Sequence, residues 1–283
     1  MADAPFDADR WTSDLRASWT SAAPDYDRLS MVHFPPVART FLRFAGVAEG
    51  AAVLDVACGT GLATMAAAEA AGEKGKVTGV DLAPGMVELA RLRAKERGYA
   101  NVSVLEKNAE DLDFPDGVFD AAVCQLGLML FARPDKALAG MRRAVRPGGA
   151  VACLVQGLGE RMLFTGLILG KALKYAPQLK TPGAPTLFGF GPEGTLTAAF
   201  QKADLKEVEE KRLSGTFEFS SPQSYWDAMT AGAGRLRGVM ETMSGEDREA
   251  LRTEVLAAAQ EHVQGGRLRM PYEFVMARGL KAP

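Results

Sequence analysis

Short apolar runs alternate with longer amphipathic stretches through the middle of the chain. The runs are rich in β-branched residues and predict strands, whereas the amphipathic stretches between them predict helices. Strands are expected at Ala52–Ala57, Lys76–Asp81, Val102–Glu106, Phe119–Gln125 and Ala150–Gln156, and helices at Leu62–Ala71, Pro84–Arg97 and Pro134–Val145. Strands separated by helices pair in parallel and are covered on both faces. The pattern therefore predicts an α/β fold with a doubly wound sheet.

The N-terminal end of the chain departs from this alternation. Trp11, Leu15 and Trp19 are spaced by four residues and predict an amphipathic helix that is broken at Pro24. A second helix is expected at Val37–Ala45, because Gly46 follows it directly. Neither helix belongs to the strand–helix alternation, so we expect them to form a cover over the core.

The pattern is also less regular beyond Gln156. We expect helices at 160–175, 192–202, 223–231 and 245–264, and strands at 205–213 and 268–278. Ser244 and Asp247 resemble a capping box in front of the last of these helices. The prediction is one domain over 1–283, with an N-terminal helical cover (1–47), a core (48–157), a cap insertion (158–203) and C-terminal strands with a helical insertion (204–283).

A glycine-containing turn stands between the first predicted strand and its helix. Gly59 and Gly61 carry no side chains, so the backbone there can approach a ligand closely. The helix that follows would present unpaired N–H groups. Asp81, at the end of the second strand, offers a carboxylate that can accept two hydrogen bonds from ribose hydroxyl groups. This order of features predicts a nucleotide-binding unit.

Two details distinguish between nucleotide cofactors. A dinucleotide-binding loop carries a third glycine, whose place Thr64 occupies here. Asp55 stands four residues before Gly59, where a carboxylate would repel a diphosphate but suits a cofactor that carries an ammonium and a sulfonium group. We expect Asp55 to act on the amino-acid end of such a cofactor, either directly or by ordering the loop and its waters.

The loop belongs to a longer series of motifs. V-L-D-V-A-C-G-T-G at 53–61 and V-T-G-V-D at 77–81 are followed by N-A-E-D-L-D-F-P-D-G-V-F-D at 108–120 and R-R-A-V-R-P-G-G at 142–149. In this order the motifs resemble the class I S-adenosylmethionine-dependent methyltransferases, in particular the branch of ubiquinone/menaquinone-type small-molecule enzymes. The resemblance covers residues 15 to 157 and is weak beyond them. It implies a Rossmann-like, seven-stranded sheet whose last strand is antiparallel and lies between the fifth and the sixth.

The resemblance also implies which residues bind the cofactor. The loop residues would hold the methionine part, Asp81 would bind both ribose hydroxyl groups, and residues after the second and third strands would contact the adenine. Gln125, at the end of the fourth strand, would lie beside the methionine part and the transferable methyl group. The predicted cofactor-binding residues are Asp55, Ala57, Gly59, Thr60, Gly61, Asp81, Leu82, Met86, Asn108, Ala109, Glu110 and Gln125.

The activity implied is transfer of a methyl group from S-adenosylmethionine to a small, apolar or aromatic acceptor by in-line displacement. Alignment does much of the work in such a reaction, since effective molarities of well-oriented partners reach on the order of 10⁵ to 10⁸ M. The candidate catalytic residues are Tyr26, which matches a family tyrosine that closes over the cofactor, and His33 in the N-terminal cover. A protein that binds the cofactor without transferring its methyl group, and a nicotinamide-dependent oxidoreductase, remain alternatives.

The composition of the chain limits the kinds of binding partner that we expect. A net charge of −2 gives no general attraction to nucleic acid or to an anionic membrane. The longest apolar run, 162–170, is too short to span a bilayer, and the acidic residues 1–10 are no signal peptide. Cys58, Cys124 and Cys153 lack metal-ligand spacing, so we expect no metal site and reduced thiols. The expectation is a cytoplasmic enzyme with a small-molecule substrate; the sequence indicates no oligomeric state.

Overall fold

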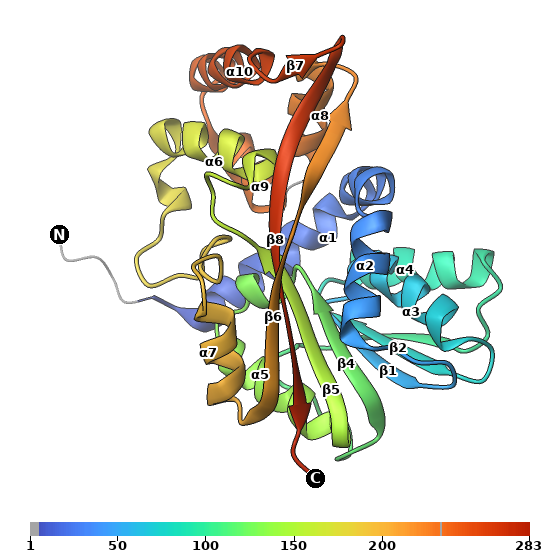
Figure 1. Cartoon of the computed structure of the whole chain (residues 1–283). Helices are drawn as coiled ribbons and strands as arrows, with labels where there is room; N and C mark the ends of the chain where they lie inside the picture. The colour runs from blue at the N-terminus through green and yellow to red at the C-terminus, as the bar shows by residue number, and fades with distance from the viewer. Residues whose placement is uncertain (1–5, 233) are drawn as a thin grey trace.

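A mixed sheet runs through the centre of the molecule, with helices on both of its faces (Figure 1). The computed structural model describes residues 6–232 and 234–283, and of residues 178 and 235 it describes only the backbone. The strands follow the order β3-β2-β1-β4-β5-β8-β6, with the short β7 paired to β8 beside this path. β8 is antiparallel to both β5 and β6, and β3, β2, β1, β4 and β5 are mutually parallel. The predicted α/β fold and the position of its last strand are confirmed.

The predicted elements of the core are present with small shifts of their ends. The strands are β1 Ala52–Val56, β2 Lys76–Asp81, β3 Val102–Glu106, β4 Phe119–Gln125, β5 Val145–Gln156, β6 Leu205–Phe219, β7 Val263–Gln264 and β8 Arg267–Lys281. The helices are α1 Ala8–His33, α2 Pro35–Ala45, α3 Leu62–Ala71, α4 Pro84–Glu96, α5 Pro134–Ala144, α6 Leu163–Tyr175, α7 Thr195–Lys202, α8 Pro222–Gly232, α9 Gly234–Thr242 and α10 Gly245–Gln260, with short 3₁₀ turns at Leu128–Leu130 and Pro177–Leu179.

Alternate residues of each central strand enter two separate hydrophobic cores. In β5, Ala152 and Leu154 belong to the core that includes α2, α3 and α6, whereas Val151 and Cys153 belong to the core that includes α5 and α7. Successive side chains of a strand point to opposite faces, so a strand that is apolar at every position is buried on both. The continuous apolar runs of the sequence are therefore explained by helices on both faces of the sheet.

Helix α1 is continuous from Ala8 to His33, so the prediction of a break at Pro24 is wrong. Proline has no N–H group, and Pro24 therefore leaves the carbonyl group of Thr20 without its usual donor inside the helix. That carbonyl lies against the first turn of α4, where an ideal Cβ on Gly85 would be 2.6 Å from the Thr20 oxygen. The first turn of a helix presents unpaired N–H groups and a partial positive charge. The Thr20 carbonyl group thus faces the positive end of α4.

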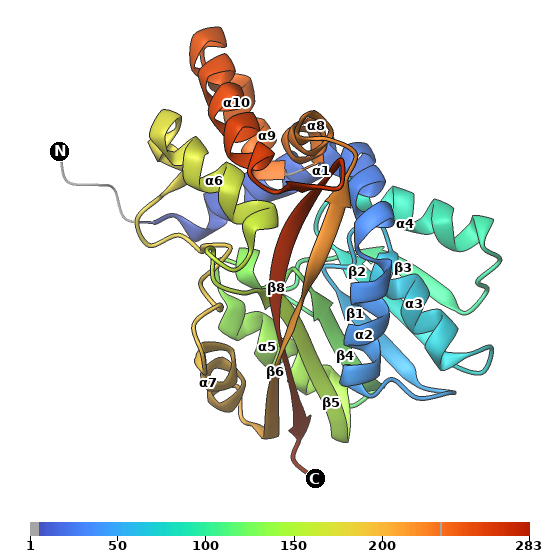
Figure 2. The same cartoon turned by 45° about the horizontal axis from the view of Figure 1, so that its top comes forward.

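β6 and β8 extend well beyond the rest of the sheet. They pair from Leu205 and Lys281 at one end to Phe219 and Leu268 at the other, so both strands are longer than predicted. Aromatic rings pack along the extension, with the Phe217 ring centroid 4.3 Å from that of Tyr272. Helices α6, α8, α9 and α10 surround this extension and form a layer above the carboxyl ends of the parallel strands, with α1 crossing beneath them (Figure 2).

Several predicted ends in the second half of the chain need correction. The turn at 147–149 is a bulge inside β5, because the register with β4 shifts between Phe119 and Ala121. Helix α9 is not among the predicted elements, and α10 ends at Gln260 rather than at 264. The cap in front of α10 is confirmed, since the side chain of Ser244 accepts a hydrogen bond from the Asp247 N–H at 3.0 Å.

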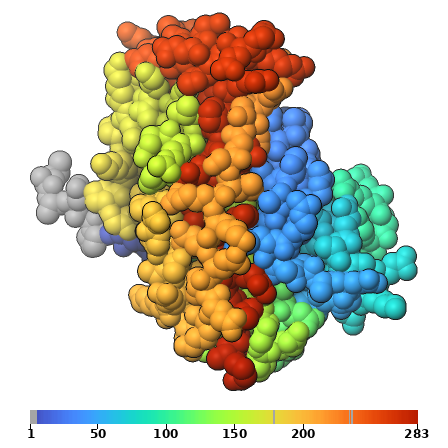
Figure 3. Space-filling model, viewed as in Figure 1, coloured from blue at the N-terminus to red at the C-terminus, as the bar shows by residue number. Residues whose placement is uncertain are grey.

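Strand β6 forms one edge of the sheet and lies at the surface on the face shown in Figure 3. Its outward positions carry charged side chains, among them Lys206, Glu209 and Lys211. Charges on an edge strand oppose pairing with a strand of another molecule. Among the described residues, no helix is both long enough and apolar enough to cross a membrane.

The packing of α1 on α4 can be tested at Gly85. Gly85→Ala places a Cβ against the Thr20 carbonyl, so we expect the free energy of unfolding, measured by urea denaturation, to fall by about 1–3 kcal/mol. Gly245→Ala is the control, because an added Cβ there meets nothing within 4 Å, and its stability should stay within about 0.5 kcal/mol of the wild type. Equal stability of the two variants would contradict the described contact.

Candidate functional site

A cavity of about 550 Å³ lies at the carboxyl ends of the parallel strands, where ligands bind in open α/β sheets. Its floor comes from residues that follow β1 to β5, and its walls come from α1, α6, the segment 179–188 and the helices α8 and α9. The predicted residues that line it are Tyr26, Ala57, Gly59, Asp81, Leu82, Met86, Asn108, Ala109, Glu110 and Gln125. The predicted residues that do not line it are His33, Asp55, Thr60 and Gly61.

Asp81 organises the loop after β1. Its Oδ2 accepts a hydrogen bond from the Gly59 N–H at 2.8 Å, and its Oδ1 accepts one from the Ala83 N–H at 2.9 Å. Burial raises the pKa of Asp81 above its usual range, although these two hydrogen bonds act in the opposite direction. Each carboxylate oxygen has two lone-pair positions, so Asp81 can accept a further hydrogen bond from a ligand in the cavity.

The glycine loop has positive φ values, which glycine adopts more readily than other residues. Gly59 and Gly61 have φ values of 55° and 88°, and Ala57 has 56°, which is uncommon for a residue with a side chain. Gly61 lies between α3 and α4, where an added Cβ would be 3.1 Å from the Cβ of Ala90. Gly61 therefore serves close helix packing beneath the loop, whereas Gly59 lies at the cavity surface.

Asp55 lies beneath the loop rather than in the cavity. It is fully buried, and its Oδ2 accepts a hydrogen bond from the Thr64 hydroxyl group at 2.6 Å. No described residue donates a hydrogen bond to its Oδ1. Burial raises the pKa of Asp55 to about 7, against the lowering effect of Thr64. Asp55 is therefore hydrogen-bonded to α3 through Thr64 and does not line the cavity.

Arg93 is a structural link that the sequence pattern does not reveal. From α4 its guanidinium group donates hydrogen bonds to the Thr60 carbonyl oxygen in the loop and to Asp27 of α1. Arg93 is 33 positions from Thr60 and 66 positions from Asp27 in the chain, so no local sequence motif joins the three residues. One arginine thus ties the loop to both helices beside it.

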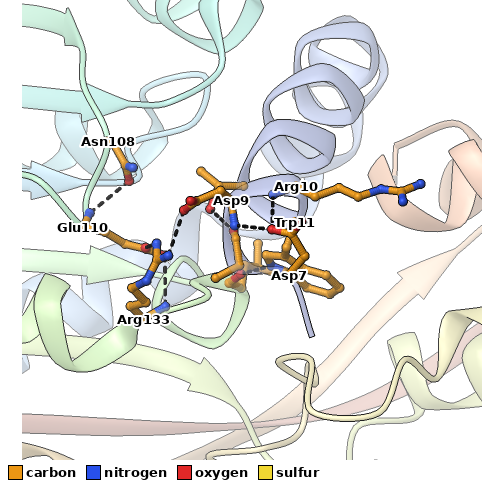
Figure 4. A network of polar contacts seen from close by, with 10 residues as sticks. Asp7, Asp9, Arg10, Trp11, Asn108, Glu110 and Arg133 are labelled. Carbon is orange, nitrogen blue, oxygen red and sulfur yellow. Dashed lines mark hydrogen bonds and ion pairs between the residues drawn. The ribbon is translucent and has the colours of Figure 1, made fainter. Parts of the chain in front are cut away.

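A chain of polar contacts joins the loop after β3 to the start of α1 (Figure 4). The Asn108 Oδ1 accepts a hydrogen bond from the Glu110 N–H at 3.0 Å. The Glu110 carboxylate accepts hydrogen bonds from the Arg133 N–H at 3.0 Å and from its guanidinium group at 3.3 Å. Arg133 also donates to Asp9 at 2.8 Å. Glu110 is therefore engaged by Arg133, and this chain fastens α1 across one end of the cavity.

The two candidate catalytic residues lie in different places. Tyr26 lines the cavity next to Gly59, and burial together with the charges of Asp81 and Asp27 raises its pKa to about 12. His33 lies outside the cavity, packed against Phe219 with the ring centroids 4.5 Å apart, and burial lowers its pKa. Tyr26 can therefore donate a hydrogen bond at neutral pH, whereas His33 does not face a ligand in this cavity.

The half of the cavity away from the glycine loop is apolar. We call this half, which is lined from α6, the segment 179–188, α8 and α9, the apolar lobe. Its large apolar side chains include Phe164, Ile168, Leu187, Met229 and Leu236. Gln125 and Gln156 lie at the ends of β4 and β5, where the two halves meet, and the Gln125 Oε1 is buried without a partner among the described residues.

Comparison with known proteins identifies relatives that are named as methyltransferases. The model of the ubiE/COQ5 methyltransferase family matches residues 20–164, just over half of the chain. Nocamycin O-methyltransferase of Saccharothrix syringae is 28% identical over 268 residues, which are 91% of this chain and 95% of the relative. Demethylmenaquinone methyltransferase of Bacillus subtilis is 32% identical over 193 residues, which are 62% of this chain and 79% of the relative.

A solved structure with this fold contains a cofactor. Phosphoethanolamine N-methyltransferase 2 of Haemonchus contortus, in complex with S-adenosyl-L-methionine, superimposes with a TM-score of 0.56 at 17% identity. The match covers 88% of this chain and 53% of that one.

The buried Asp55 carboxyl group should make stability depend on pH. Between about pH 4 and pH 7 the native state holds a proton that the unfolded state has lost, so the free energy of unfolding falls as the pH rises through this window. The loss due to Asp55 is at most about 4 kcal/mol. Asp55→Asn keeps an acceptor for Thr64 and should remove this part of the slope, measured by urea denaturation at several pH values. An unchanged slope would contradict the raised pKa.

Proposed function

Because the chain belongs to the ubiE/COQ5 methyltransferase family, and is therefore an S-adenosylmethionine-dependent methyltransferase, we propose that its acceptor is a small apolar or aromatic molecule held in the apolar lobe. The observation that supports this most directly is one continuous cavity with two chemically different halves. One half carries the Asp81 carboxylate and the glycine loop, and the other half carries aliphatic and aromatic side chains. Family membership excludes the alternative of a nicotinamide-dependent oxidoreductase.

The residues of the first half fit S-adenosylmethionine. The free lone pairs of Asp81 suit two ribose hydroxyl groups, and Leu82 and Met86 offer apolar surface to the adenine. Asn108 and Ala109 would meet the adenine edge, and the unpartnered Gln125 Oε1 suits the ammonium group of the methionine part. When bound, the cofactor supplies a methyl group on a sulfonium, which is a good leaving group.

We propose that the protein contributes mainly alignment and exclusion of water. Glu110 is held by Arg133, Tyr26 remains protonated at neutral pH, and His33 lies outside the cavity, so none of these three is placed to act as a strong base. An acceptor whose reacting group ionises readily, such as a phenol or an enol, needs little such help. α1, fastened by Arg93 and Arg133, would keep water from the reacting groups.

The names of the relatives agree with this choice of acceptor, since one is named for nocamycin and the other for demethylmenaquinone. A direct test offers the purified protein S-adenosylmethionine with 1,4-naphthalenediol or with phosphoethanolamine. We expect S-adenosylhomocysteine and a methylated product with the aromatic diol only, detected by mass spectrometry. Turnover of phosphoethanolamine alone would contradict the apolar acceptor. Cofactor binding without turnover of either compound would contradict an aromatic diol as the acceptor. The alternative of a binding protein without transfer activity predicts, in addition, that no acceptor yields S-adenosylhomocysteine.

The role of Asp81 can be measured separately by calorimetry. Asp81→Ala removes two charge-assisted hydrogen bonds of roughly 1.5–3 kcal/mol each, so S-adenosylmethionine should bind well over tenfold more weakly. Asp111→Ala is the matched control, because Asp111 is an exposed carboxylate of the nearby loop that does not line the cavity, and its affinity should equal that of the wild type. Unchanged affinity of Asp81→Ala would exclude Asp81 as a cofactor ligand.

A further inference from the structure

A buried polar pair lies in the wall of the apolar lobe. Gln156 at the end of β5 and Thr165 in the first turn of α6 are each only 7% exposed, and both line the cavity. The Thr165 hydroxyl group donates a hydrogen bond to the Gln156 Oε1 at 2.6 Å. The side chains around them are mostly apolar, so this pair is a polar exception that requires an explanation.

The hydrogen bond to Thr165 satisfies only part of the Gln156 amide group. A glutamine side chain has an acceptor oxygen and an NH₂ group with two donor hydrogens. No described residue accepts a hydrogen bond from the Gln156 Nε2. A structural role of this hydrogen bond, which links β5 to α6, would account for the Gln156 oxygen. It would not account for the Gln156 NH₂ group, which has no partner among the described residues. Because Thr165 holds the oxygen, the nitrogen is the atom left to meet a ligand.

The pair lies where the acceptor and the methyl group would meet. The Leu126 N–H donates to the Leu154 carbonyl oxygen at 2.7 Å, and the Gln156 N–H to the Met129 sulfur at 3.3 Å, so the end of β5 lies directly beside the segment that follows β4. Neighbouring strands are about 4.8 Å apart. Gln156 is thus one strand away from Gln125, on the side of the apolar lobe.

None of the described charged residues that line the cavity is available to pair with a charged acceptor in the apolar lobe. Arg16, Lys107 and Glu110 pair with Glu106, Asp113 and Arg133 respectively. Asp81 is on the side of the glycine loop, and Lys180 is exposed to solvent. A neutral ligand is therefore favoured in the apolar lobe, because burying an unpaired charge is costly.

We propose that the Gln156 Nε2 donates a hydrogen bond to an oxygen of the acceptor, and that Thr165 positions the amide group for this contact. The acceptor class is then a neutral, ring-containing compound that carries a carbonyl oxygen or the tautomeric enol oxygen. This inference rests on the proposed function, since it assigns the acceptor to the apolar lobe. Gln156 is a specificity-determining residue, because it distinguishes a ketone from a hydrocarbon of the same shape.

The test uses two probes that differ by one oxygen atom. 1-Tetralone and tetralin are titrated into the full chain saturated with S-adenosylhomocysteine, and their affinities are measured by ligand-observed NMR. We expect the wild type to bind the ketone more tightly than the hydrocarbon by on the order of fivefold. Gln156→Leu should bind both equally, and Thr165→Val should show a reduced preference. Thr186→Val, which removes another hydroxyl group from the cavity wall, should keep the wild-type preference.

The outcomes separate this inference from the proposed function. Each variant is first checked for S-adenosylhomocysteine affinity, which should equal that of the wild type and shows that the variant is folded. A wild type that binds S-adenosylhomocysteine but does not prefer the ketone overturns the role of Gln156 alone. A preference that persists in Gln156→Leu, or that is lost in Thr186→Val instead, overturns it as well. Failure of the wild type to bind S-adenosylhomocysteine overturns the proposed function, and this inference with it.

Discussion

The Asp81 carboxylate is the contact on which the rest of the site depends. It accepts hydrogen bonds from the N–H groups of Gly59 and Ala83, so a single side chain fixes the loop after β1 and the start of α4. Both segments then present their remaining groups to the same cavity. The arrangement is possible because β1 and β2 are parallel neighbours whose carboxyl ends meet at one edge of the sheet.

The cover over this half is held by polar contacts at separate positions along α1. Arg93 reaches Asp27, Arg133 reaches Asp9, and the Trp11 indole N–H donates to the Leu130 carbonyl oxygen at 2.8 Å. Each contact comes from a different element of the core, so α1 is fixed along its length. Pro24 lies in the middle of this helix, and the Thr20 carbonyl group, which loses its helical donor to the proline, faces α4. The cover is therefore part of the cavity wall.

The opposite half of the cavity is built from segments with no local motif. α6, the segment 179–188 and α8 are separated along the chain by β6 and by irregular stretches, and the extended β6 and β8 bring them together. Apolar side chains supply most of the wall, which suits ring-containing compounds of many shapes. The few polar groups, above all Gln156 with Thr165, then decide the orientation of what is bound.

The sequence by itself determined the α/β core and its parallel strands, and it pointed to Gly59 and Asp81, which line the cavity. A strand, a turn and a helix in succession are local features. Asp81 lies only 22 positions from Gly59, whose N–H group donates a hydrogen bond to it. The same local logic failed at Pro24, because α4, against which the Thr20 carbonyl group lies, follows only after β1, α3 and β2 in the chain. It also gave no sign of Arg93 or Arg133 as links, since their partners are far away in sequence.

Only the tertiary structure decided which candidates face the cavity. It placed Tyr26 in the wall, His33 outside it and Asp55 beneath the loop, although the sequence had made each of them a candidate for the site. It also brought Gln156 and Thr165 together at the edge of the apolar lobe. The physical reason is that burial, charge pairing and hydrogen bonding depend on neighbours in space, which periodicity along the chain does not specify.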